Sequence, residues 1–76
     1  MANEGTVLLN NWLQARNRVT SLSWEESTTG PRHSPQWTSV CKIDGQDYGR
    51  GTGAQKHLAR DIAAKAALER LIQESE

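Results

Sequence analysis

The fold is decided by residues 49–67, which read GRGTGAQKHLARDIAAKAA. Glycine occupies positions 49, 51 and 53, and alternate residues of a strand point to the same side. A strand without side chains on one side can twist tightly, adopt a positive φ, or let another segment approach its backbone closely. We therefore expect a strand that ends in this glycine-rich stretch and a helix that begins just after it.

The helix expected after the glycines presents cations in its first turn. At 100° per residue, Lys56, His57 and Arg60 fall within one arc of about 100°. An apolar stripe turned well away from that arc would form the packing face: Ala59, Ile62, Ala63, Ala66 and Ala67. Free N–H groups and the positive end of the helix dipole lie at the same turn and attract anions. The pattern favours binding of a phosphate backbone, and taken alone it also fits an amphipathic helix with solvated cations.

The composition indicates one small domain without overall charge. The 76 residues include 36% hydrophobic residues, and nine basic residues cancel nine acidic ones. This balance counts against a nucleic-acid binder that acts through net charge, although basic residues predominate between positions 50 and 65. One cysteine and two histidines give neither a disulfide nor a zinc-finger spacing, so we expect no metal and no cofactor. The first residues, MANEGTV, lack the features of a signal peptide, and no apolar run approaches about 18 residues. We expect no membrane association and an intracellular location, in the cytoplasm rather than the nucleus.

The pattern of the whole chain predicts an α+β fold of order αβββα. A helix with Leu8, Leu9, Trp12 and Leu13 on its apolar side is followed by strands that are joined through a type I′ turn at Asp44-Gly45. The expected elements are a helix over 6–16, a strand over 19–26, a loop over 27–35, strands over 37–43 and 46–51, and a helix over 55–74. Both helices pack most economically on one face of the antiparallel sheet. We expect one domain over residues 5–74, with flexible termini at 1–4 and 75–76.

Three motifs, in this order, resemble those of double-stranded RNA-binding domains. The chain has Leu-Asn-Asn at 9–11 where that family has a leucine-asparagine-acidic pattern, and it has Gly-Pro-Arg-His-Ser-Pro-Gln-Trp at 30–37. Residues 51–60, GTGAQKHLAR, resemble the family's Gly-x-Gly-x-x-Lys-Lys-x-Ala-Lys motif. The chain departs from the family pattern at Asn11, His57 and Arg60. Arginine keeps the charge of lysine, whereas histidine keeps it only partly near neutral pH.

The resemblance implies non-catalytic binding of double-stranded RNA by its A-form shape. Neutral side chains of the first helix would enter one minor groove, and the loop would reach the next. Cations of the second helix would contact phosphates across the intervening major groove, so that the site spans about 16 base pairs. The residues implied are Thr6, Asn10, Asn11 and Gln14 in the first helix, Gly30, Pro31 and His33 in the loop, and Lys56, His57 and Arg60 in the second helix.

An alternative with the same fold is a module for dimerisation or for docking onto an RNA-processing protein. The neutral net charge and His57 favour it, while Lys56, Arg60 and the intact loop argue against it. A second copy would pair with the open edge of the third strand or with the sheet face that carries Val40. The three tryptophans and Cys41 are expected in the core rather than in a site. Histidines, aspartates and the cysteine are scattered without the spacing of a catalytic group, which argues against an enzyme.

Overall fold

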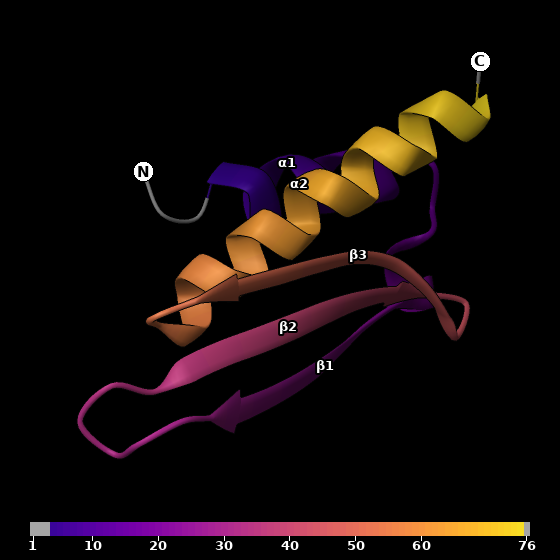
Figure 1. Cartoon of the computed structure of the whole chain (residues 1–76). Coiled ribbons are helices and arrows are strands. Elements are labelled where there is room, and N and C mark those ends of the chain that lie inside the picture. Colours follow the sequence, from indigo (N-terminus) through magenta and orange to yellow (C-terminus); the bar gives the residue numbers. More distant parts are fainter. Residues whose placement is uncertain (1–3, 76) are drawn as a thin grey trace.

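The computed structural model describes residues 4–75 and has the predicted αβββα order (Figure 1). Its elements are α1 (Glu4–Ala15), a 3₁₀ turn (Val19–Ser21), β1 (Leu22–Thr29), β2 (Gln36–Ile43), β3 (Gln46–Gly53) and α2 (Lys56–Ser75). Residues 1–3 and 76, which belong to the termini predicted to be flexible, lie outside the described part, whereas Glu4 and Ser75 belong to the helices. The first strand was expected over 19–26, but β1 begins three residues later, at Leu22, and continues to Thr29.

The three strands form an antiparallel sheet in the order β1-β2-β3, and both helices cover one face of it (Figure 1). Asp44 and Gly45 have positive φ values of 54° and 80°, as the predicted type I′ turn requires. The β2–β3 register shifts after the Cys41–Gly49 pair, because Lys42 pairs with Asp47 and leaves Tyr48 as an extra residue. The predicted architecture is confirmed.

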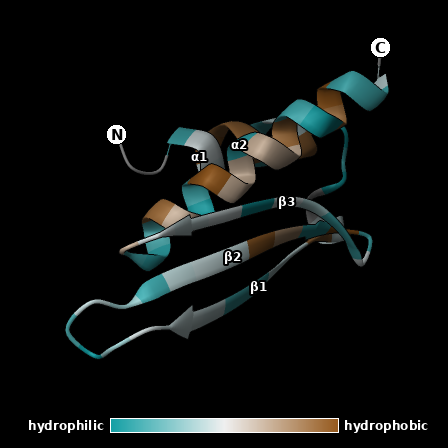
Figure 2. Cartoon of the chain, in the orientation of Figure 1, coloured by the Kyte–Doolittle hydropathy of each residue, from teal (hydrophilic) through white to brown (hydrophobic). Residues whose placement is uncertain are grey.

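The core lies between the helices and β2. Leu9 and Leu13 of α1 belong to one buried cluster with Cys41 and Ile43 of β2, and each of these side chains is at most 1% exposed. The hydropathy colouring shows the same layer, with hydrophobic stretches along both helices and in the second half of β2 (Figure 2). Burial raises the pKa of the Cys41 thiol to about 12, so this cysteine is an inert core residue, as predicted.

Two glycines of β3 let α2 lie directly on the strand. A Cβ atom at Gly49 would collide with the carbonyl oxygen of Ala63, and one at Gly51 would collide with that of Ala59. Neither glycine has a positive φ, so close approach, rather than backbone conformation, explains the absence of side chains here. The alternating glycines thus fix the height of α2 above the sheet.

The buried faces of both helices differ from the predicted ones. Leu8 and Ile62 are 47% and 49% exposed, and Ala66 is exposed as well. The buried stripe of α2 consists of Ala59, Ala63, Ala64, Ala67 and Leu71. The face is rotated because α2 packs against α1 as well as against β3 and β2. The predicted stripe was wrong on this point, since alanines give little contrast between faces.

The sheet face opposite the helices offers little apolar surface. Val40 lies there, as predicted from its alternation with Cys41, yet it is only 6% exposed. Its register partners are Glu25 on β1 and Arg50 on β3. Lys42 on the same face pairs with Glu25 at 3.0 Å. The Val40 face is therefore a charged surface, which does not favour it as a hydrophobic dimer interface.

Candidate nucleic-acid interface

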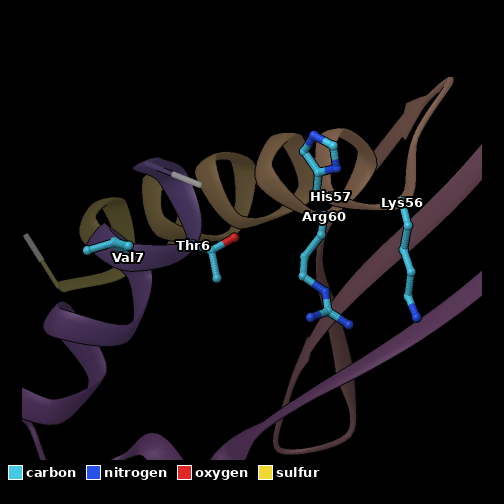
Figure 3. Close-up of a pocket in the computed structure, with 5 residues that line it drawn as sticks. All are labelled: Thr6, Val7, Lys56, His57 and Arg60. Atoms are coloured by element: carbon cyan, nitrogen blue, oxygen red, sulfur yellow. The ribbon is translucent and has the colours of Figure 1, made fainter. Parts of the chain in front are cut away.

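The N-terminal ends of α1 and α2 meet at an open groove. It has a volume of about 540 Å³ and is lined by Thr6, Val7, Lys56, His57 and Arg60 (Figure 3). The structure therefore brings one predicted minor-groove residue next to all three predicted phosphate contacts. Thr6 is half-buried, while Lys56 and His57 are exposed.

A buried carboxylate joins the two helices beneath this groove. Asp61 of α2 is 7% exposed and accepts hydrogen bonds from the backbone N–H groups of Gly5, at 2.6 Å, and Thr6, at 3.3 Å. These are first-turn donors of α1 without an intrahelical partner, so Asp61 caps α1 from another element. Gly5 makes room for the contact, because a Cβ there would lie 2.7 Å from the carbonyl oxygen of Asp61. Asp61 thus fixes the position of Thr6 relative to the cations of α2.

A second carboxylate pairs with two of the three cations of the predicted phosphate site. Glu26 of β1 accepts two hydrogen bonds from Arg60, from Nε at 3.0 Å and from Nη2 at 2.8 Å. Lys56 Nζ lies 3.6 Å from the same carboxylate. Burial acts to raise the pKa of Glu26, but hydrogen bonding and charge from Arg60, together with Lys56, outweigh it and leave that pKa below its ordinary value.

Aromatic rings lie under the same two cations. The guanidinium of Arg60 is 5.1 Å from the ring centre of Trp24, and Lys56 Nζ is 5.8 Å from that of Trp37. Both side chains extend in one direction, whereas His57 points the opposite way (Figure 3). Arg60 turns toward the sheet because it precedes buried Ala64 by one helical turn and so shares its side of α2. The three side chains therefore do not form the single outward-facing patch that the sequence predicted.

The remaining predicted residues lie outside the groove. Asn10 of α1 is half-buried, and Asn11 and Gln14 are exposed. In the β1–β2 loop Gly30 has a φ of 92°, and the N–H of Ser34 donates to the carbonyl of Pro31 at 3.0 Å. Gly30 and Pro31 line a separate hollow beside Trp37, and His33 is exposed. The loop projects beyond the sheet, away from the C-terminal end of α2 (Figure 1).

The family model of the double-stranded RNA binding motif matches residues 7–71. The chain belongs to the double-stranded RNA-binding domain family. Ribonuclease 3 of Rhodopseudomonas palustris is 36% identical over 63 residues, which are 83% of this chain and 23% of that protein. The double-stranded RNA-specific editase Adar of Drosophila melanogaster is 48% identical over 48 residues, which are 63% of this chain and 7% of that protein.

A solved structure shows the same fold as this double-stranded RNA-binding domain. The solution structure of both dsRBDs of DRB4 with their linker matches with a TM-score of 0.70 and 27% identity, over 92% of this chain and 45% of that one. The domain spans only about a quarter of the length of the ribonuclease 3 proteins that it resembles, for example 23% of the protein of Rhodopseudomonas palustris and 26% of that of Streptococcus thermophilus. The similarity therefore concerns a binding domain, and it does not assign the chemistry of those larger proteins to this chain.

Two residues of this double-stranded RNA-binding domain were missed by the sequence reasoning. Glu26 continues the alternation of Leu22 and Trp24, which places it on the helix-facing side, where a carboxylate needs a cationic partner. That signal was available in the sequence. Asp61 had no such signal, because its burial depends on where α1 crosses α2.

Two features, a metal-binding cluster and a membrane-spanning helix, are absent from the described part of the domain. Between residues 4 and 75, no three His, Cys, Asp or Glu side chains gather closely enough to hold a metal ion. In the same range no helix combines the length and the hydrophobicity needed to cross a bilayer.

Proposed function

We propose that the domain binds double-stranded RNA by its A-form shape, through two successive minor grooves and the phosphates of the major groove between them. Membership of the family supports double-stranded RNA as the ligand. The observation that supports the finer mechanism is the groove in which Thr6 of α1 meets Lys56, His57 and Arg60 of α2. A neutral hydroxyl beside cations suits a ligand that displays 2′-hydroxyl groups beside phosphates.

The three regions would divide the work by their chemistry. Asn10, Asn11 and Gln14 bear groups that donate and accept hydrogen bonds, which suits the 2′-hydroxyls and base edges of a shallow minor groove. Gly30, Pro31 and His33 would contact the next minor groove from the end of the β1–β2 hairpin. Contacts of this kind carry little sequence information, so RNA duplexes of unrelated sequence should bind within a few-fold of one another.

The direct test compares a duplex RNA of about 20 base pairs with the matching DNA duplex and with single-stranded RNA, by gel shift or anisotropy. The proposal expects clear preference for duplex RNA. Equal binding to duplex DNA or to the single strand would contradict shape recognition.

A second candidate function is self-association or docking onto a protein of RNA processing. The observation that favours it is the pairing of Lys56 and Arg60 with Glu26, which reduces the charge available for RNA. The edge of β3 is the surface where a second copy would pair. Sedimentation at about 100 µM separates the candidates, because a strict monomer that binds duplex RNA leaves self-association without support.

A further inference from the structure

The first turn of α2 carries less free charge than its sequence indicates. Both oxygens of Glu26 accept from Arg60, and Lys56 Nζ lies 3.6 Å from one of them. The side chain of Glu26 is 15% exposed, so solvent screens this carboxylate weakly. Two cations therefore share one negative charge and leave a formal excess of one positive charge at this place.

The position of the carboxylate puts it in competition with phosphate. A phosphate that binds Arg60 through its Nε and Nη2 groups would need the N–H donors that Glu26 already uses at 3.0 and 2.8 Å. If phosphate instead takes the donors that remain free, its charge lies within several ångströms of the carboxylate, and like charges repel. Either arrangement costs binding energy that a neutral side chain would not cost.

We propose that Glu26 is an internal counterion that competes with RNA phosphates for Lys56 and Arg60 and thereby sets the affinity of the domain. This inference rests on the proposed function, since it concerns the same groove. Trp24 and Trp37 support the pairing of the two cations with Glu26, because Arg60 lies 5.1 Å from the ring centre of Trp24 and Lys56 Nζ lies 5.8 Å from that of Trp37. Binding of RNA would then exchange one anionic partner for another.

The neighbouring residue supplies a matched control. Glu25 is on the same strand and pairs with Lys42 at 3.0 Å, but its side chain is 70% exposed and lies on the opposite face of the sheet. Glu25→Gln and Glu26→Gln remove the same charge from adjacent positions. Both variants change the net charge equally and so change the general attraction to the polyanionic RNA equally. The difference between their RNA affinities therefore measures the competition of Glu26 with phosphate.

The experiment measures the affinity of the whole chain for a duplex RNA of about 20 base pairs at two salt concentrations, after circular dichroism has shown that each variant is folded. We expect Glu26→Gln to bind about 3- to 10-fold more tightly than Glu25→Gln at low salt, with a smaller gain at high salt. The gain should disappear when Lys56→Gln and Arg60→Gln are added. Glu26→Thr, which suits a strand, repeats the test if Glu26→Gln is unfolded.

The outcomes separate the inference from the proposed function. If the wild type binds duplex RNA but Glu26→Gln binds it no more tightly than Glu25→Gln does, the counterion role is overturned and RNA binding stays in place. A gain that survives the loss of both cations also overturns it, because the effect then arises elsewhere. Absence of duplex RNA binding in both the wild type and Glu26→Gln overturns the proposed function, and the inference falls with it.

Discussion

Asp61→Ala should destabilise the domain by about 2 kcal/mol. The substitution removes the acceptor for the N–H groups of Gly5, at 2.6 Å, and Thr6, at 3.3 Å. Loss of an N-terminal cap costs about 1 to 2 kcal/mol, and a buried N–H left without a partner costs about 1 to 3 kcal/mol, which overlaps with the first value rather than adding to it. The higher helix propensity of alanine returns about 0.5 kcal/mol. For a domain of this size the net loss corresponds to a melting temperature lower by about 8–16 °C.

The assay is urea and thermal unfolding followed by circular dichroism, with two comparison variants. Asp61→Asn keeps one carbonyl oxygen as an acceptor and should lose about half as much. Lys65→Met removes only the ion pair at 3.4 Å with Asp61, whose lysine side chain is 57% exposed, and should change stability by less than about 0.5 kcal/mol. If Asp61→Ala unfolds within about 0.5 kcal/mol of the wild type, the carboxylate does not cap α1, and the reasoning is refuted.

Three other predictions concern packing, charge and pH. Gly51→Ala should destabilise by at least about 2 kcal/mol in urea unfolding because its Cβ meets the α2 backbone, whereas Gly53→Ala, whose nearest foreign atom is 3.2 Å away, should cost less than about 1 kcal/mol. In RNA binding, Lys56→Ala should weaken the affinity and flatten the slope of log affinity against log salt by a little under one unit. Gln14→Ala should weaken the affinity by about 0.5–1.5 kcal/mol without changing that slope. Equal slopes for the two variants would contradict the assignment of Lys56 to phosphate and Gln14 to the minor groove. Since the folded state lowers the pKa of Glu26, its ionisation stabilises the fold above the ordinary carboxyl pKa of about 4.3, and this contribution is lost as pH falls through the lower, folded-state pKa. The stability advantage of the wild type over Glu26→Gln should therefore shrink as pH is lowered from about 6 to about 3 in unfolding experiments, and a constant difference would exclude the titration of Glu26 as its source.

The element order was predictable because its signals are local. Asp44-Gly45 specifies a tight hairpin turn, and the glycines of β3 leave room for a neighbouring backbone. Both signals depend on residues close together in the chain. The bulge at Tyr48 was not visible in the pattern, because one extra residue in a strand changes the alternation without any distinctive composition.

The arrangement of the candidate site was less predictable, because it depends on contacts between distant segments. Ile62 drew the predicted stripe toward a face that is in fact exposed, and this displaced the expected direction of Arg60. The pairing of Arg60 with Glu26 joins residues 34 positions apart, and that of Asp61 with Gly5 joins residues 56 positions apart. Periodicity assigns side chains to faces of one element, but the partner across the gap follows only from the tertiary packing.

The inert thiol of Cys41 gives the domain a built-in reporter of its own opening. Because this cysteine is the chain's only one and its side chain is 0% exposed, a thiol reagent reacts with it only when β2 is released from beneath the helices. The rate of labelling at low reagent concentration then measures the population of open molecules, without any substitution or attached dye. Bound RNA that stabilises the closed domain would slow this labelling by the same factor by which it lowers the open population.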